Sequence, residues 1–594
     1  MANKKLFDSS LQDVVYSIDV GAGLKILRIG LYILLLLVIV LIYTATQFWG
    51  LSQEEAMDFS QLGRNFSFTE GLITKNISPF TMNLVEGMDA NDNPRIRQHP
   101  DLIHPPAYPM LLSFGFQIYD WLNVDPFAME LGTRIIPAER WVIVPLNHLF
   151  TMLTGLLIFS IGKHLFYREI GFLSMTIFYL SDSAWSQAIM GLNLPMAIFF
   201  SVAAFRSAII GVKYRLEERN LKRFWMSFVA SVLFCCVAFY TRYLTAVIVP
   251  AIAFYFFNMN GKLRGGTRYL FLYMALFLLM VTPWLLRNYA LCGNPFGWTL
   301  HTALLGSTIF PDLSLLRDYQ PTLSFAVIVE ALKEKWVWNY SGTHRDLIPG
   351  LGGGLLMSFF ITAFFYKFTR PAINRLRNVL GFSLLLMVFL AGFFAESSMQ
   401  LINLFWPFVI LFGVAFFYIL LDRWDLQARL YMVAMKCFLV VVTFLPLGLR
   451  ILPPQAQQPY PPYFPPIISH VSGMLTPREV LCTDMPWATA WYGDRISILL
   501  PQDIEQYYEI NDYKQYISGI YFTPLTKNKP FVSELLDGPE KSWLPILSGR
   551  LPADFPLKVA LALNREDQLF VSDRDRWSNK TEKAETADQV NLRR

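Results

Sequence analysis

Long apolar runs, separated by short polar loops, constrain this sequence more than any other feature. They lie at 31–49, 141–162, 169–187, 193–212, 224–241, 244–257, 269–287, 351–366, 379–395, 400–421 and 431–450. A helix needs about 20 apolar residues to cross the hydrocarbon core of a bilayer. The chain is 54% hydrophobic and only 16% charged, whereas soluble domains carry about 25% charged residues. The sequence therefore predicts an α-helical polytopic membrane protein with about eleven transmembrane helices.

Basic residues indicate how such a bundle would be oriented. Lys and Arg gather in alternate loops, at 163–168, 213–223, 262–268, 367–377 and 423–429. Short cytoplasmic loops carry an excess of Lys and Arg. We therefore expect a cytoplasmic N-terminus, no cleaved signal peptide and an extracytoplasmic C-terminus. The residues on either side of Thr241-Arg242-Tyr243 could also form one long kinked element rather than two spans.

Three segments on the outer side are long enough to carry function. They are a first loop at 50–140, a second at 288–350 and the chain that follows residue 450. A proline-rich stretch opens the last segment, and Pro cannot continue a helix. Runs such as REVLCTDMP, ISILLP and YISGIYFTP then read as short strands, with a helical IEQYYEINDYKQ between the last two. We expect a transmembrane module at 1–450, a small extracytoplasmic α/β domain at 451–575 and a disordered tail at 576–594.

The first loop begins with three acids, Glu54, Glu55 and Asp58, in a stretch with a helical pattern. Residues three or four apart share a helix face, so the acids would point the same way. A carboxylate held at the outer membrane surface could act as a general base. A simpler explanation is also open, because Ser52-x-x-Glu55 has the form of a capping box and acids favour the first helical turn.

A second segment of the same loop reads HPDLIHPPAYP, from His99 to Pro109. Its prolines stop a helix and restrict the preceding backbone, so His104 and Tyr108 would be presented rigidly. A turn with an incidental histidine would look the same. A metal site built from two histidines and the acids is conceivable, but the spacing is not diagnostic of one.

Arginines at the outer ends of two spans are candidate phosphate ligands. Arg242 and Arg287 fall at that level in the predicted topology, and the guanidinium fork suits bidentate contact with phosphate. Interfacial arginines that snorkel to water would give the same pattern. Cys292 and Cys482 both fall outside in this topology, where they could form a disulfide or remain free thiols.

Several of these segments together resemble a known family. EEAMDFSQLGRNFSFTEG resembles the first-loop signature of bacterial membrane glycosyltransferases related to protein O-mannosyltransferases and the aminoarabinose transferase of lipid A. Residues that fit the order of this signature are Glu55, Phe59, Arg64, Asn65 and Gly71. HPPAYP, TPWLLRNYALCGNPF and LINLFWPFVIL resemble later motifs of the same family, and DMPWATAWYGDRISILLP resembles part of its outer domain. The match is ordered along most of the chain.

This resemblance implies the GT-C fold and an inverting glycosyltransferase in the bacterial cell (inner) membrane. The donor would be a polyprenyl-phosphate sugar, and the acceptor a protein, lipid or glycan, with membrane lipids but no nucleic acid as further partners. Glu55 stands where the family has an Asp, so the resemblance implies that Glu55 or nearby Asp58 is catalytic. Arg242 and Arg287 would bind the donor phosphate, and the substrate-binding candidates are His104, Tyr108 and Arg64. The sequence requires no cofactor and leaves a divalent metal open.

Other classes of membrane protein fit less well. A transporter or lipid flippase would show broken or charged helices near mid-membrane and related halves, whereas this chain has large outer loops. A polysaccharide polymerase or ligase also uses polyprenyl-linked donors, but would depend on a late outer loop. In a membrane scaffold without catalytic activity, the acids of the first loop would be helix caps only.

Overall fold

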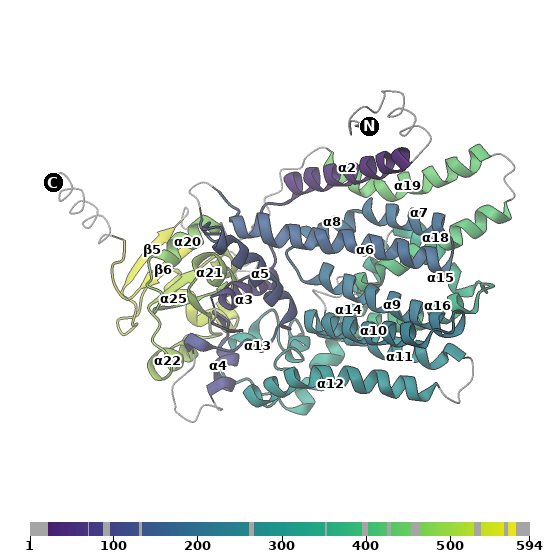
Figure 1. Cartoon of the computed structure of the whole chain (residues 1–594). Helices are drawn as coiled ribbons and strands as arrows, with labels where there is room; N and C mark the ends of the chain where they lie inside the picture. The colour runs from purple at the N-terminus through teal and green to yellow at the C-terminus, as the bar shows by residue number, and fades with distance from the viewer. Residues whose placement is uncertain are drawn as a thin grey trace, which may run out of the picture.

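A computed structural model describes residues 22–68, 70–86, 96–129, 133–260, 266–350, 353–394, 402–424, 429–452, 464–527, 536–563 and 568–577. A bundle of long helices lies beside a domain that contains a β-sheet, and the first loop sits between them (Figure 1). This arrangement puts the first loop, the ends of several long helices and the C-terminal domain in one region.

Eight helices in the described residues are long and apolar enough to cross a membrane. They are α2 (Ala22–Gln47), α6 (Val144–Leu165, extended at its start by a π-helix, Glu139–Ile143), α9 (Leu194–Leu216), α10 (Leu221–Thr241), α12 (Thr267–Cys292), α16 (Pro371–Ala391), α18 (Trp406–Arg423) and α19 (Arg429–Ile451). The chain is thus a helical, multi-pass membrane protein, as the sequence predicted.

The three remaining apolar runs form shorter elements. The run at 244–257 is a 3₁₀ turn, η3 (Tyr243–Val247), that leads into α11 (Ile248–Phe257), and the run at 351–366 contains α15 (Gly353–Phe365). The run at 169–187 is divided into α7 (Arg168–Tyr179) and α8 (Asp182–Ile189), because the chain leaves the helix at Leu180 and Ser181. Hydropathy located each run but did not show this break.

The chain reverses direction at Arg242. Helix α10 ends at Thr241, and Arg242 has an extended backbone with φ −153° and ψ 118°. Phe228, near the start of α10, contacts Phe256, near the end of α11, with 4.8 Å between ring centroids. The two segments are therefore antiparallel neighbours rather than one kinked helix. This reversal places Arg242 at the end of the bundle that faces the first loop.

A six-stranded sheet forms the centre of the C-terminal domain, in the order β1-β3-β2-β4-β6-β5. Its strands from this domain are β2 (Val480–Thr483), β3 (Ile496–Leu499), β4 (Gly519–Phe522), β5 (Val559–Leu563) and β6 (Gln568–Ser572). The helices around it are α20 (Pro465–Gly473), α21 (Pro486–Gly493), α22 (Ile504–Tyr513), α23 (Pro524–Lys527) and α25 (Leu544–Leu547). The three predicted strands and the helix before the third are confirmed. The proline-rich linker and most of the predicted tail lie outside the described residues.

The remaining strand, β1 (Asn76–Ile77), comes from the first loop. It pairs in parallel with β3, so that Asn76 is opposite Ser497. Backbone pairing thus joins the first loop to the C-terminal domain, and the sheet takes strands from both sides of the boundary predicted at residue 451. Cys482 lies buried in β2, and both it and Cys292 are free thiols.

The two large loops are themselves mostly helical. The first loop contains α3 (Glu54–Ser67), α4 (Pro79–Glu86) and α5 (Ala107–Trp121), and the second contains a 3₁₀ turn (His301–Leu304), α13 (Ser314–Arg317) and α14 (Phe325–Gly350). Helices α3 and α5 pack closely at Gly63. A Cβ atom there would lie 2.9 Å from the Leu112 Cβ, so this contact requires glycine. It fixes α3, which carries the acids.

Candidate functional site

Helix α3 presents the acids of the first loop to a cavity. The residue before the helix is Gln53, and no side chain caps the first turn. The predicted capping box of Ser52 and Glu55 is therefore not formed. Glu55 and Asp58 instead line a cavity of about 320 Å³, with Glu54 also on its wall. Glu54 and Glu55 lie in the first turn of α3, as the simpler explanation also predicted, whereas Asp58 lies beyond it.

Segments from distant parts of the chain build this cavity. Its walls come from α3, the β1–α4 region, residues 99–105, the reversal at Arg242, the second large loop and the C-terminal domain. Polar residues on these walls include Glu54, Glu55, Asp58, Thr74, Asn76, Ser78, Thr81, His99, Asp101, His104, Asn193, Arg242, Tyr243, Thr299 and Thr302. The cavity therefore lies at the junction of the bundle, both outer loops and the sheet domain.

Asp58 is held by an amide from the strand that joins the two parts. Asn76 Nδ2 donates to both carboxylate oxygens of Asp58, at 2.8 Å and 3.0 Å. Burial raises the pKa of Asp58 to about 6, although nearby His104 and the Asn76 hydrogen bonds favour the ionised form. Asp58 can thus accept a proton near neutral pH.

His104 is a buried cation beside these acids. Its Nδ1 lies 3.0 Å from Asp101 Oδ1, and its backbone N–H donates to the other oxygen of Asp101. Burial alone would lower the pKa of His104, but the carboxylates of Asp101, Asp58 and Glu55 outweigh burial and raise it to about 9. The imidazole is therefore charged at neutral pH. Its ring packs edge-on against Phe59, with 4.8 Å between centroids.

Arg242 supplies a second positive charge from the opposite wall. Its Nη2 lies 3.6 Å from Glu55 Oε2, and its Nη1 donates to Asn193 Oδ1 at 3.1 Å. The side chain of Arg242 is 11% exposed and that of Glu55 36% exposed. The ion pair with Glu55 is therefore long and partly exposed.

Arg287 supports the cavity but does not line it. Its Nη1 donates to the backbone oxygen of Asp101 at 2.9 Å, and its guanidinium lies 4.6 Å from the centre of the Trp284 ring. Arg287 therefore holds the segment that carries Asp101 and His104. Of the two arginines predicted to bind phosphate, the structure brings only Arg242 to the cavity wall.

Arg64 and Tyr108, predicted to bind substrate, also lie away from the cavity. Arg64 is buried and donates to the backbone oxygens of Trp491 and Ala490 at 2.8 Å and 2.6 Å. The hydroxyl of Tyr108 donates to Asn147 and to the backbone oxygen of Gly191. The hydrogen bonds of both side chains join structural elements, and neither side chain lines this cavity, so that they contact substrate stays a prediction.

The lining residues that the sequence analysis missed include Asn76, Asp101, Asn193 and Trp487. Trp487 comes from α21 of the C-terminal domain and is 4% exposed, and its indole N–H has no hydrogen-bond partner among the described residues. The DMPWATAWYGDR segment drew attention to this part of the chain, but nothing in its spacing showed that it reaches the first loop. Asp101 was visible only as the residue three before His104.

The two histidines of the first loop were considered as metal ligands together with the acids, and both lie in this region. His99 also lines the cavity, and burial lowers its pKa to about 4 despite Asp101, so the ring is neutral at pH 7. Across the described ranges, no three His, Cys, Asp or Glu side chains gather in a way that could hold a metal ion. His104 and Asp101 are paired with each other instead, with 3.0 Å between Nδ1 and Oδ1.

Comparisons with known proteins identify the architecture. Residues 124–286 match the family model of dolichyl-phosphate-mannose-protein mannosyltransferases, and no curated protein sequence matches the chain. Two solved structures of an Archaeoglobus fulgidus oligosaccharyltransferase are similar. One, with zinc and sulfate, has a TM-score of 0.54 and 11% identity, over 84% of this chain and 69% of that one. The other holds an inhibitory peptide and a dolichol-phosphate, with TM-score 0.54, 11% identity and coverage of 83% and 69%.

A third similar structure comes from a bacterium. ArnT from Cupriavidus metallidurans bound to undecaprenyl phosphate aligns with 92% of this chain and 98% of its own length, at 12% identity and a TM-score of 0.51. At identities this low, it is the structural similarity that shows a shared fold. The chain therefore has the GT-C fold of these membrane glycosyltransferases, and its residues 124–286 match the dolichyl-phosphate-mannose-protein mannosyltransferase family.

Proposed function

We propose that this protein is an inverting glycosyltransferase that moves a sugar from a polyprenyl-phosphate donor to an acceptor outside the cytoplasm. One observation carries the proposal: the cavity at the end of the bundle brings the carboxylates of Glu55 and Asp58 together with the cations His104 and Arg242. Glycosyl transfer from a lipid phosphate needs both kinds of group, since a proton must leave the acceptor and a negative charge develops on the leaving phosphate.

The cations are the proposed site for the donor phosphate. Arg242 can turn its guanidinium from Glu55 to a phosphate oxygen, because that ion pair is 3.6 Å long and partly exposed. His104 is charged at neutral pH and already fixed by Asp101. Charges that are fixed in place before the reaction in this way stabilise the charge that develops on the leaving phosphate. Arg287 acts indirectly, through the backbone of Asp101.

Asp58 is the proposed general base. Its pKa of about 6 lies nearer to neutral pH than that of an ordinary carboxyl group, and Asn76 fixes its orientation. The acceptor oxygen would attack the anomeric carbon while its proton passes to Asp58. The bond between the anomeric carbon and the phosphate oxygen breaks, and polyprenyl phosphate leaves on the opposite face. An in-line attack of this kind inverts the anomeric configuration.

Glu55 has a different proposed role. It takes the position of the Asp that the family resemblance implies, but in this structure it faces Arg242. Its carboxylate is therefore occupied by the guanidinium of Arg242, whereas Asp58 makes no such pair with an arginine in the described residues. We assign Glu55 to neutralising the guanidinium of Arg242 until the donor phosphate displaces it.

This function implies a topology. Donor and acceptor would meet on the extracytoplasmic face of a bacterial inner membrane, with the N-terminus in the cytoplasm. The fold neighbours support a lipid donor, because ArnT was crystallised with undecaprenyl phosphate and the archaeal oligosaccharyltransferase with dolichol-phosphate. The acceptor class, protein, lipid or glycan, follows from neither.

The direct test uses the full-length protein in proteoliposomes. Polyprenyl phosphates carrying radiolabelled mannose, glucose or aminoarabinose are supplied, and water-soluble label and free polyprenyl phosphate are both measured. We expect one donor to be cleaved, and cleavage to be lost in Arg242→Gln. Movement of intact donor across the bilayer without cleavage would instead identify a flippase, and cleavage that survives Arg242→Gln would remove the proposed phosphate site.

A further inference from the structure

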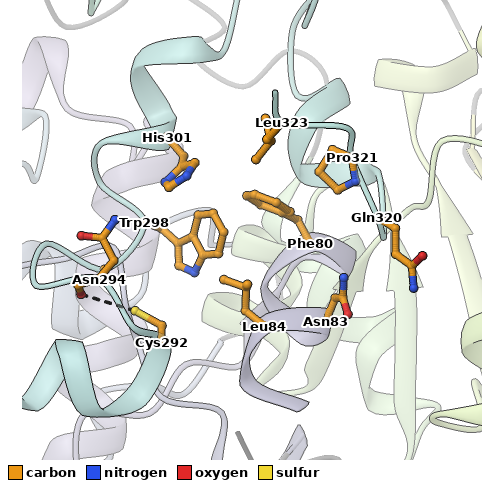
Figure 2. A pocket seen from close by; sticks show the side chains of 11 residues that line it. Phe80, Asn83, Leu84, Cys292, Asn294, Trp298, His301, Gln320, Pro321 and Leu323 are labelled. Atoms are coloured by element: carbon orange, nitrogen blue, oxygen red, sulfur yellow. Dashed lines mark hydrogen bonds between the residues drawn. The ribbon is translucent and has the colours of Figure 1, made fainter. Parts of the chain in front are cut away.

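A second cavity of about 510 Å³ lies beside the candidate catalytic cavity. It opens where α12 ends, between α4 of the first loop and the second large loop. Its walls are Phe80, Asn83, Leu84, Cys292, Asn294, Gly297, Trp298, His301, Gln320, Pro321 and Leu323, most of which are labelled in Figure 2. Its volume falls within the range of small-molecule sites, which is roughly 300–1,000 Å³.

A shared backbone layer separates the two cavities. The backbone N–H of Trp298 donates to the backbone oxygen of Leu102 at 2.9 Å, and the hydroxyl of Thr299 donates to the backbone oxygen of Ile103 at 2.7 Å. Leu102, Ile103 and Thr299 line the catalytic cavity, whereas Trp298 lines the second one. A molecule in the second cavity would therefore lie one layer from the proposed catalytic groups.

Aromatic rings form one wall of the second cavity. Figure 2 shows the rings of Trp298, Phe80 and His301 gathered on one side. The centroid of Trp298 lies 4.0 Å from that of Phe80 and 4.4 Å from that of His301. Trp298 is only 4% exposed, and neither its indole N–H nor Nδ1 of His301 has a hydrogen-bond partner in the described part of the chain.

The polar groups on the other walls are uncharged. Three side-chain amides, those of Asn83, Asn294 and Gln320, line the cavity, and no Asp, Glu, Lys or Arg is among its described lining residues. Burial lowers the pKa of His301, so its ring is neutral at pH 7. Amides can both donate and accept hydrogen bonds. The cavity thus offers aromatic surface and neutral hydrogen-bonding groups together.

We propose that this second cavity binds an uncharged sugar unit of a glycan acceptor. A sugar ring has an apolar C–H face that packs on an aromatic wall, and hydroxyls that pair with amides and with an unpartnered N–H. A phosphate or carboxylate would lose its hydration without a cation to replace it, and an acyl chain would leave the buried indole N–H unpaired. The acceptor role rests on the proposed glycosyltransferase function, whereas the binding of sugar does not.

Saturation-transfer NMR on the full-length protein tests this proposal. The protein is placed in lipid nanodiscs, because maltoside detergents would themselves present sugars. The probes are mannose, N-acetylglucosamine and cellobiose, with glucuronic acid and glucose 1-phosphate as charged counterparts. The variants are Leu323→Trp, which fills the cavity, Trp298→Phe, which keeps a ring but removes the N–H, and Gln320→Ala. Asp58→Asn alters the catalytic cavity and is the control.

We expect at least one neutral probe to bind the unaltered protein and Asp58→Asn equally. Trp298→Phe should weaken binding about fivefold, the value of one hydrogen bond, and Leu323→Trp should abolish it. The proposal is overturned if Leu323→Trp leaves the signal unchanged, if no neutral probe binds, or if the charged probes bind better. Hydrolysis of the polyprenyl-phosphate sugar donor is measured in parallel. Its absence in the unaltered protein would refute the proposed function while the NMR result still decides the sugar site.

Discussion

Arg64 of the first loop and Asp494 of the C-terminal domain form an ion pair, with 2.6 Å between Nη2 and Oδ1. Arg64 also donates to two backbone oxygens of α21, and Lys75 donates to the same oxygen of Asp494 at 2.8 Å. These contacts lie beside the pairing of β1 with β3. The C-terminal domain is thus fastened to the helix that carries Glu55 and Asp58, and its position decides the shape of the cavity.

Replacing Arg64 by Met should loosen this connection. The change leaves two buried carbonyls of α21 without a donor. Each unsatisfied group lowers the free energy of unfolding by about 1–3 kcal/mol. We expect a clear fall in the unfolding temperature, followed by tryptophan fluorescence of the full-length protein. The control is Asp494→Asn, which should cost no more than about 1 kcal/mol because this carboxylate is half-exposed. Equal losses in the two variants would argue against the carbonyl contacts as the main link.

The pKa of His104 predicts an alkaline limit to activity. His104 is cationic below about pH 9 and neutral above it, so binding of the donor phosphate should weaken as the pH rises through 9. We expect kcat/KM to fall in that range. His104→Lys should move the limit to higher pH, since a lysine stays charged longer, and His104→Gln should remove the limit and lower activity at every pH. An unchanged alkaline limb in His104→Lys would exclude this histidine as its cause.

Gly297 should be essential to the wall between the two cavities. Its φ is +58°, and a Cβ atom would lie 2.0 Å from the Leu102 oxygen. Gly297→Ala should therefore displace residues 102–104 and lower both stability and transfer. Gly306 is a matched control in the same loop, because its φ is +74° but a Cβ atom would meet nothing within 4 Å. Gly306→Ala should lower the free energy of unfolding by about 1–2 kcal/mol, because alanine disfavours a left-handed backbone. Transfer should be preserved.

Arg242 and Glu55 should affect the binding of lipid phosphate in opposite ways. Removing the cation in Arg242→Gln costs a charge-assisted contact of about 1.5–3 kcal/mol, or roughly 10- to 150-fold in Kd. Glu55→Gln frees the guanidinium from its carboxylate partner, so binding should be at least as tight as in the unaltered protein. Native mass spectrometry with undecaprenyl phosphate measures both. Weaker binding in Glu55→Gln would show that Glu55 supports the phosphate site rather than competing with it.

Much of the fold could be predicted from patterns within short windows. Apolar runs of bilayer length located the helices, and short runs with strand composition located β2, β3 and β4. The same method identified α3 and its acids. It could not show the break at Leu180 or the direction of the chain after Arg242, because both depend on packing against distant helices.

The site depended on contacts that no local pattern encodes. Asn76 and Asp101 became part of it only because β1 and the 99–105 segment fold against α3. Arg64 belongs to a motif that resembles the first-loop signature of the family, but its partners lie in α21 near the other end of the chain. Motif resemblance thus selected the correct loop, while the structure assigned each side chain either to the cavity or to the support around it.

Single-turnover transfer by Asp58→Asn tests the central claim most directly. The unaltered protein should lose activity as the pH falls below about 6, because a protonated Asp58 cannot accept the acceptor proton. Asp58→Asn should bind undecaprenyl phosphate within about twofold of the unaltered protein, yet transfer roughly 10²- to 10⁴-fold more slowly and without that acidic limb. Transfer at the normal rate in Asp58→Asn, or a greater loss in Glu55→Gln, would contradict the assignment of Asp58 as the base.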